Sequence, residues 1–344
     1  MVDDPILRRI CRQAGVPDLV EALSERIPPT DLRTLLLEVT RRSAERRHPA
    51  DLRSRHAADR TVAPAPAAAD GRALARVSLQ ALESAPDYQP IELSPVEPQG
   101  LNQVLGRIDQ NNVLATVRST EVVADPTSAL TLEAAARRTG GQSAVRLCTC
   151  HRVLRLQPFD GPGLLQHFRL FAMVSAGRSE PGHGFALRAL AEHVEAYLML
   201  YGALHPGGRA VVRLSDTAVH QHLRERGVEP TADVAAPADA VPEAELGALG
   251  RRLHRLERAM DAVRPLAAHT PGVRVLTDLS RTHATGYYDG LQLRIDVEVD
   301  GEMRDVADGG SVDWMQRLLS DRREALFTSG IGLERMLPGY PPPP

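Results

Sequence analysis

The spacing of hydrophobic residues predicts helices at the start of the chain. In residues 4–48 the hydrophobic positions fall three or four residues apart, as at Leu32, Leu36 and Val39, which places their side chains on one face of an α-helix. Two adjacent prolines break this run, and Thr30 directly after them is placed to cap the next helix. The sequence therefore predicts an N-terminal helical region over residues 1–48.

Residues 49–70 lose this periodicity. The segment is polar at first and then turns to alternating alanine and proline, a composition that is typical of linkers. We therefore predict a flexible linker over residues 49–70, followed by another amphipathic helix over residues 71–85.

Beyond Tyr88 the pattern changes to strand-like runs with helical stretches between them. The runs cover residues 113–123, 144–156, 168–176, 209–214, 273–279 and 291–299, and the main helical stretches cover residues 183–203 and 244–268. This pattern predicts an α+β domain with mostly antiparallel strands over residues 71–338, and a proline-rich tail over residues 339–344. Prolines and alanines in residues 229–242 indicate an inserted, mobile segment.

The overall composition is ordinary for a globular protein, with 43% hydrophobic and 25% charged residues. No apolar run reaches the roughly 18–20 residues of a membrane helix, and the N-terminus has no signal-peptide core. We expect a cytoplasmic protein without membrane contact. Its three cysteines are too few and too unevenly placed for a disulfide framework.

Lysine is absent from the sequence, so all 41 residues of the lysine and arginine class are arginines. This excludes reactions that need a lysine amine, such as a pyridoxal-phosphate imine or a phosphate-loop lysine. The formal net charge of −3 argues against a protein whose main task is to neutralise nucleic-acid phosphates. Any phosphate must therefore be bound by arginine, helix N-termini or metal.

The segment FTSGIGLERML, residues 327–337, carries the most specific chemical signal. Gly330 and Gly332 would let a polyphosphate approach the backbone closely, and the planar guanidinium of Arg335 can make paired, charge-assisted hydrogen bonds to it. By itself this pattern is also a common way to start a helix.

A second signal lies in residues 146–178, where two strand-like runs flank a loop of Pro, Gly and Asp. Arg155 ends the first run and Phe168 begins the second. A plain hairpin with an exposed arginine and a core phenylalanine would give the same pattern.

Four further segments appear in a fixed order around these two. They are DYQPIELSPVEP at residues 87–98, TVRSTEVVADPTSALTLEAA at residues 116–135, HATGYYDGLQLRIDVEV at residues 283–299 and VADGGSVDWMQRLL at residues 306–319.

Together these segments resemble the catalytic core of class II aminoacyl-tRNA synthetases. The resemblance is closest to the histidyl type and to the regulatory subunit of ATP phosphoribosyltransferase, and it covers residues 71–337. It implies an antiparallel sheet flanked by helices, to which the N-terminal helices are appended. It also implies a homodimer, because Pro90 in the first of the four segments matches a proline at the family's dimer interface.

The resemblance assigns roles to individual residues. It implies that Arg155 and Arg335 are catalytic and hold the phosphates of ATP together with Mg²⁺, with no metal site built by the protein alone. The other residues implied to bind ATP are Gln157, Phe168, Gly330 and Gly332. The residues implied to bind the amino acid or similar carboxylate are Glu121, Asp125, Thr127, His283, Tyr287, Tyr288, Gly309 and Gly310.

The sequence also departs from the family pattern. Gln157 stands where the family has a glutamate, and His283 stands where the histidyl type has a catalytic arginine. That arginine is either missing here or replaced by nearby Arg281. Loss of one such group typically costs on the order of 3 kcal/mol of transition-state stabilisation. The segment at residues 327–337 is followed by PGYPPPP, where the histidyl type continues into an anticodon-binding domain. We therefore expect no tRNA substrate.

Cys148, Cys150 and His151 could suggest a zinc site. In a strand, however, the two cysteines share one face and His151 points to the other, so we expect buried cysteines beside the pocket floor. His220 and His222 are expected to have no role.

Two functional hypotheses follow. The first is an enzyme that activates an amino acid or similar carboxylate with ATP and passes it to a protein, carrier or small-molecule acceptor. The second is a non-catalytic regulatory subunit that senses an amino acid or nucleotide in the same pocket. A purely structural role in dimerisation is a third alternative.

Overall fold

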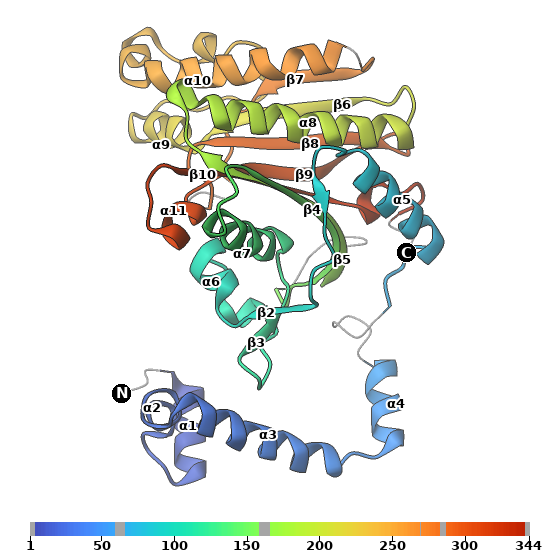
Figure 1. Cartoon of the computed structure of the whole chain (residues 1–344), viewed down its shortest axis with the longest axis vertical. Helices are drawn as coiled ribbons and strands as arrows, with labels where there is room; N and C mark the ends of the chain where they lie inside the picture. Colours follow the sequence, from blue (N-terminus) through green and yellow to red (C-terminus); the bar gives the residue numbers. More distant parts are fainter. Residues whose placement is uncertain (1–3, 59–65, 158–165, 269, 283–286, 341–344) are drawn as a thin grey trace.

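The computed structural model describes residues 4–58, 66–157, 166–268, 270–282 and 287–340 (Figure 1). No helix in these ranges is both long enough and apolar enough to cross a membrane.

The N-terminal region is helical, as the spacing predicts. It contains α1 (Pro5–Ala14), α2 (Leu19–Glu21), the π-helical turn η1 (Ala22–Arg26), α3 (Pro29–Glu45) and α4 (Pro49–Ala58). These helices lie apart from the sheet in Figure 1. The Asp4 carboxylate caps α1 by accepting the backbone N–H groups of Ile6 and Leu7.

Two local expectations in this region are corrected. Thr30 does not cap α3, because Pro29 occupies the first helical position, where its missing N–H and fixed φ cost nothing. Residues 49–58 form α4, whereas their composition predicts a linker. This stretch has no glycine, and its only proline is the first residue of the helix.

An eight-stranded sheet forms the core of residues 71–340. Its strand order is β1-β4-β5-β10-β9-β8-β6-β7, and every neighbouring pair is antiparallel except β1 with β4 and β6 with β7. The strands are β1 (Gln89–Pro90), β4 (Val145–Leu154), β5 (His167–Arg178), β6 (Ala210–Asp216), β7 (Val273–Thr277), β8 (Leu291–Val299), β9 (Glu302–Val312) and β10 (Glu324–Gly332). The expected mostly antiparallel sheet is confirmed.

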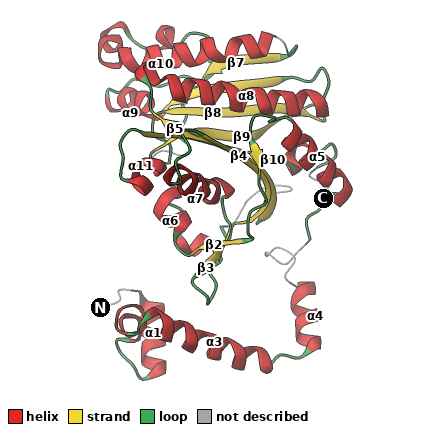
Figure 2. Ribbon diagram, viewed as in Figure 1, coloured by secondary structure: helices red, strands yellow, loops and turns green. Residues whose placement is uncertain are grey.

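Helices cover both faces of the sheet (Figure 2). One face packs against α5 (Gly71–Glu83), α8 (Gly184–Leu204) and α10 (Glu243–Ala268), and the other against α6 (Leu101–Gly106), α7 (Pro126–Thr139) and α11 (Trp314–Leu319). The remaining elements are β2 (Val96–Pro98), β3 (Thr120–Val122), α9 (Thr217–Glu225) and four 3-10 turns, η2 (Gln110–Asn112), η3 (Pro181–His183), η4 (Pro237–Ala240) and η5 (Glu334–Met336).

The alternation of side chains along β5 explains why both faces are buried. Phe171 and Met173 belong to the hydrophobic cluster under α8, whereas Ala172 and Val174 belong to the cluster under α7. A strand buried on both faces reads as a continuous hydrophobic run, which is what this segment shows.

Two other expectations differ from the fold. Of the strand expected over residues 113–123, only β3 forms, and it pairs with β2 outside the main sheet. Residues 229–242 pack against the core, because Val241 is buried and Val234 exchanges backbone hydrogen bonds with Thr277.

A chain of hydrogen bonds lies between α8 and the face of the sheet that it covers. The Nδ1 atom of His193 lies 2.6 Å from the Ser329 hydroxyl, which also lies 2.6 Å from the Tyr197 hydroxyl. On the other side of the ring, Nε2 lies 3.1 Å from the Ser175 hydroxyl, which is 2.6 Å from the Tyr88 hydroxyl. A neutral imidazole with its proton on Nε2 satisfies every one of these contacts.

The stability of the protein should therefore fall in acid through His193. Complete burial lowers the pKa of His193 to about 3, so the unfolded chain, in which histidine titrates near pH 6.5, binds an extra proton between these values. We expect the free energy of unfolding to decrease through this residue by up to about 1.4 kcal/mol per pH unit as pH falls below 6.5. Chemical denaturation between pH 7 and pH 4 measures this dependence. The free energy of unfolding should decrease less steeply with falling pH in His193→Gln than in the wild type, and identical slopes in the two proteins would contradict this.

Candidate functional site

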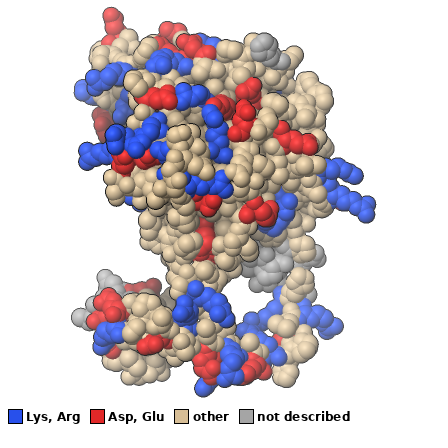
Figure 3. Space-filling view, in the orientation of Figure 1, with Lys and Arg blue, Asp and Glu red and all other residues tan. Residues whose placement is uncertain are grey.

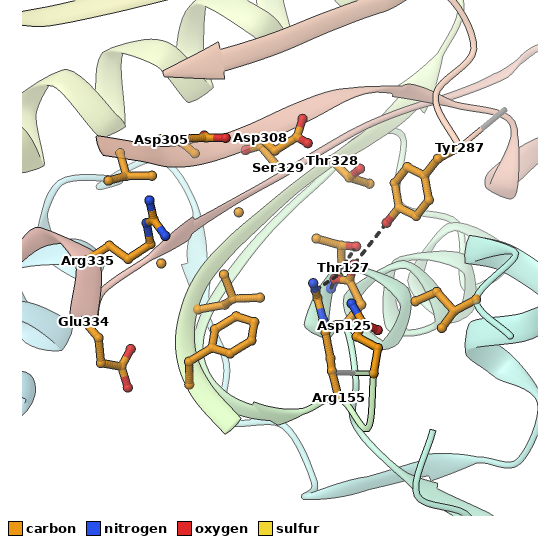
Figure 4. Close-up of a pocket in the computed structure, with 18 of the residues that line it drawn as sticks. Asp125, Thr127, Arg155, Tyr287, Asp305, Asp308, Thr328, Ser329, Glu334 and Arg335 are labelled. Atoms are coloured by element: carbon orange, nitrogen blue, oxygen red, sulfur yellow. Dashed lines mark hydrogen bonds and ion pairs between the residues drawn. The ribbon is translucent and has the colours of Figure 1, made fainter. Parts of the chain in front are cut away.

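A pocket of about 480 Å³ opens on the face of the sheet that carries α7 (Figure 4). Its lining comes from the start of α7, the end of β4, and strands β5, β9 and β10. The lining residues include Asp125, Thr127, Arg155, Gln157, Phe168, Tyr287, Tyr288, Asp305, Asp308, Thr328, Ser329, Gly330, Gly332, Glu334, Arg335 and Tyr340. Ten of the residues singled out from the sequence lie in this set.

Arg155 is held in place at the pocket wall. It follows the last residue of β4, and its backbone N–H donates to the carbonyl of Gln166 at 2.7 Å. Its Nε donates to the carbonyl of Ala124 at 2.9 Å, and its guanidinium carbon lies 5.3 Å from the centre of the Phe168 ring. The stacking and the Nε hydrogen bond fix the guanidinium plane, leaving its terminal nitrogens directed to the pocket (Figure 4).

Asp125 begins α7 and connects several pocket residues. Its Oδ1 accepts the backbone N–H and the hydroxyl of Thr127 at 3.0 and 2.8 Å, so it caps the helix. Its Oδ2 accepts the hydroxyl of Tyr287 at 3.1 Å and lies 3.7 Å from the Arg155 guanidinium. Burial raises the pKa of Tyr287 well above its usual value, so this tyrosine remains a donor.

Arg335 approaches the pocket from the other side (Figure 4). It directly follows Glu334, whose buried carboxylate accepts the backbone N–H of Arg169 at 2.8 Å and pairs with Arg152 at 3.3 Å. Within the described ranges, the Nε of Arg335 is buried without a hydrogen-bond partner. Glu334 therefore anchors the turn, while Arg335 is left to meet a ligand.

Gly330 and Gly332 form the floor between the two arginines. They alternate along β10, so both face the pocket. A Cβ at Gly330 would come no closer than 3.7 Å to Leu170. The absence of side chains here leaves open space, as the sequence pattern predicts.

Gly309 and Gly310 were expected to bind substrate, but neither lines the pocket. A Cβ at Gly309 would lie 2.5 Å from the Ser329 Cβ, and one at Gly310 would lie 2.7 Å from the Tyr288 ring. Both glycines are needed for close packing of β9 against its neighbours, which the sequence pattern could not distinguish from ligand contact.

Glu121 was also expected to bind substrate, and it too lies outside the pocket. Its fully buried carboxylate accepts the backbone N–H groups of Gly100 and Asn102 at 2.7 and 3.1 Å, at the N-terminus of α6. Burial raises the pKa of neighbouring Glu97 to about 8, which keeps this second carboxyl protonated near neutral pH. The pair therefore supports α6.

Arg281 is not placed to act in the pocket as the resemblance would require. Its side chain is 5% exposed and donates to Asp308 at 2.8 Å and to the carbonyl of Leu293 at 3.2 Å, and it is absent from the pocket lining. His283 lies outside the described residues.

Sequence reasoning missed Asp305, Asp308, Glu334 and Tyr340 as pocket residues. The sequence holds a signal for Asp308, which directly precedes Gly309 in a segment that the resemblance covers. In the structure it pairs in register with Gly330 of the floor. No comparable signal existed for Tyr340.

The two cysteines of β4 lie on the opposite face of the sheet from the pocket. The thiol of Cys148 approaches the carbonyl of Tyr88 and that of Cys150 the carbonyl of Ser78, and burial raises both thiol pKa values to about 12. Their common face agrees with the strand argument, but their place beside the pocket floor does not. In the described part of the chain, no three His, Cys, Asp or Glu side chains gather to hold a metal ion.

Several solved structures resemble this one. An ATP phosphoribosyltransferase regulatory subunit/histidyl-tRNA synthetase from Bacillus halodurans has a TM-score of 0.57 and 13% identity, covering 77% of this chain and 78% of its own. A histidine–tRNA ligase subunit from Alicyclobacillus acidocaldarius has a TM-score of 0.53 and 17% identity, and the match covers 79% of this chain and 95% of the subunit. Histidyl-tRNA synthetase from a Nostoc species has a TM-score of 0.55 and 15% identity, and the match covers 77% of this chain and 70% of the synthetase.

No protein-family model and no curated protein sequence matches this chain. At these identities the structural likeness establishes the fold alone. The chain has the fold of a histidyl-type class II synthetase core, as the order of its motifs predicts.

Proposed function

We propose that this protein uses ATP to activate an amino acid or a similar carboxylate. The observation that carries the proposal is that Arg155 and Arg335, about 180 residues apart in the sequence, line one pocket. Phe168 and the glycine floor of β10 lie in the same pocket. This combination of two guanidiniums, an aromatic ring and open backbone suits a nucleoside triphosphate.

In the proposed reaction, a carboxylate oxygen of the substrate attacks the α-phosphorus of ATP. A new carbon–oxygen–phosphorus linkage forms as the bond to the β-phosphate oxygen breaks, so the products are an acyl-adenylate and pyrophosphate. Arg155 would stabilise charge at the α-phosphate, and Arg335 would hold the γ-phosphate. Catalysis would rest on positioning and electrostatic stabilisation, with Asp125 and Thr127 close enough to receive a substrate ammonium.

Mg²⁺ is proposed to arrive with ATP. Magnesium sites at nucleotides commonly use one or two carboxylates together with phosphate oxygens and water. Asp305 and Asp308 on β9 are the carboxylates of the lining proposed for this role. Asp125 and Glu334 are already engaged by neighbouring groups, whereas Arg281 meets Asp308 at Oδ1 and leaves Oδ2 for a metal ion.

The acceptor of the activated group is proposed to be a protein, a carrier or a small molecule, and the active form a homodimer. β1 is exposed, two residues long, and pairs only with β4 among the described strands, so its other edge is open to a second copy. Light scattering at micromolar concentration should give about twice the chain mass of 37.4 kDa. A mass that stays at one chain would contradict the dimer.

A specific observation favours the sensing alternative. Arg155 and Arg335 are the two arginines of the described pocket lining, while four carboxylates share it, namely Asp125, Asp305, Asp308 and Glu334. With Arg281 bound behind the pocket, no third guanidinium in the described lining would neutralise the reacting phosphate. Such a site could bind nucleotide and amino acid without joining them.

Amino-acid-dependent pyrophosphate exchange distinguishes the two functions. We expect one of the common amino acids, or an amino-acid analogue, to stimulate the exchange of labelled pyrophosphate into ATP. The activity should be lost in Arg155→Ala and kept in Arg188→Ala, which changes an exposed arginine paired with Glu180. ATP binding without exchange for any compound would favour sensing, and exchange unaffected by Arg155→Ala would exclude this pocket.

A further inference from the structure

The chain turns back to the pocket after η5. Leu337 and Tyr340 are only 7% and 6% exposed, and Tyr340 is part of the pocket lining. The Tyr340 N–H donates to the carbonyl of Leu337 at 3.3 Å, closing a turn. Through Tyr340, the turn at residues 337–340 therefore contributes to the wall of the pocket that Arg335 also lines.

This turn is attached to the hairpin between β8 and β9. Gly339 has a φ of +71°, a conformation that glycine adopts without strain. Its N–H donates to the Asp300 carboxylate at 2.7 Å. Arg304 connects the two, since it pairs with Asp300 at 3.3 Å and donates to the carbonyl of Arg335 at 3.3 Å. Hydrogen bonds therefore attach the chain to this hairpin both at Arg335 and at Gly339.

Tyr340 is close enough to Arg335 to affect its electrostatics. Burial raises the pKa of the Tyr340 phenol, and Glu334, Arg335 and Arg152 are the charged groups that act on it. The phenol therefore stays un-ionised, and its ring lines the same pocket as the guanidinium. In the described chain no ion pair or hydrogen bond restrains the Arg335 side chain. Tyr340 is buried and lines the same pocket, so its ring is placed to limit the freedom of this side chain.

We infer that Tyr340 is a positioning residue that holds the Arg335 guanidinium over the pocket for the terminal phosphate of a nucleoside triphosphate. This inference rests on the proposed function. The ring restricts the arginine before the ligand arrives, which reduces the conformational entropy lost on binding. The effect depends on the ring, because the hydroxyl is not needed to confine a neighbouring side chain.

A double-mutant cycle tests this inference. We expect Tyr340→Ala to weaken ATP binding about three- to tenfold, the size expected for coupled neighbours, and to have almost no further effect in the background of Arg335→Ala. Binding of AMP, which has no terminal phosphate, should change little in Tyr340→Ala. Tyr340→Phe retains the ring and should bind ATP like the wild type.

The arms of the experiment separate the two claims. Equal weakening of ATP and AMP, or full additivity of Tyr340→Ala with Arg335→Ala, would show a general structural role and overturn the inference. ATP binding that falls in Arg335→Ala but not in Tyr340→Ala would overturn the inference alone. No ATP binding by the wild type would overturn the proposed function together with it. Asp300→Asn, which weakens the attachment of Gly339 without altering the ring, provides a second variant if Tyr340→Ala fails to fold.

Discussion

The substitution Arg335→Ala is expected to weaken ATP binding about ten- to a hundredfold while leaving the protein folded. A guanidinium held to phosphate by charge-assisted hydrogen bonds contributes about 1.5–3 kcal/mol, which corresponds to this loss. Because no described residue depends on an ion pair with Arg335, its removal leaves no buried charge without a partner. Titration calorimetry with Mg²⁺ and ATP measures the loss, and thermal unfolding checks the fold.

The same change at Arg155 should weaken ATP binding by a similar factor and also lower stability slightly. This arginine donates to the carbonyl of Ala124 and neighbours Asp125, so its loss removes contacts within the protein itself. Phe168→Ala should reduce affinity less, since it keeps both guanidiniums and removes only ring stacking, on the nucleotide and on Arg155. Arg188→Ala, remote from the pocket lining, is the matched control. An unchanged affinity in both pocket variants would contradict the assignment of this pocket to ATP.

The substitution Gly309→Ala is expected to destabilise the protein by about 1–3 kcal/mol or more, the usual cost of overpacking. The added Cβ would lie 2.5 Å from the Ser329 Cβ and 2.8 Å from the carbonyl oxygen of Thr328. Neither atom can move easily, because both belong to the central strand β10. The midpoint of chemical denaturation measures this effect.

Gly330→Ala is the control for this prediction, because it lies on the same pair of strands with room for a methyl group. Its Cβ would make only ordinary contacts, the nearest at 3.7 Å from Leu170. We expect near wild-type stability and weaker ATP binding, since the methyl group would point to the pocket. Equal stability of the two variants would show that β9 and β10 are less tightly packed than this account holds.

The parts of the fold that were predictable from sequence are those with long periodic patterns or ordered motifs. The runs that became β4, β5 and β8 are continuous or alternating, and the motif order brought Arg155 and Arg335 to one site. Local pattern failed where a contact depends on tertiary structure. Glu121 lies in a segment that the resemblance assigns to substrate, yet its carboxylate supports α6.

Burial and charge distribution were the least predictable features. On the face of the molecule that Figure 3 shows, arginines are scattered over the sheet domain and over the N-terminal helices, so a sequence rich in arginine gives no indication of which ones reach a pocket. Arg281 shows this most clearly, because it is near the expected site in sequence and pairs with the lining residue Asp308, yet it does not line the pocket itself. Tyr340 reaches the pocket only because the chain turns at Gly339.

Calorimetric titration of the wild-type protein with Mg²⁺ and ATP, alone and with amino acids, tests the central claim most directly. We expect saturable binding of one ATP per chain, weakened in Arg335→Ala and Arg155→Ala and retained in Arg188→Ala. No heat of binding up to millimolar nucleotide, with or without amino acids, would contradict it.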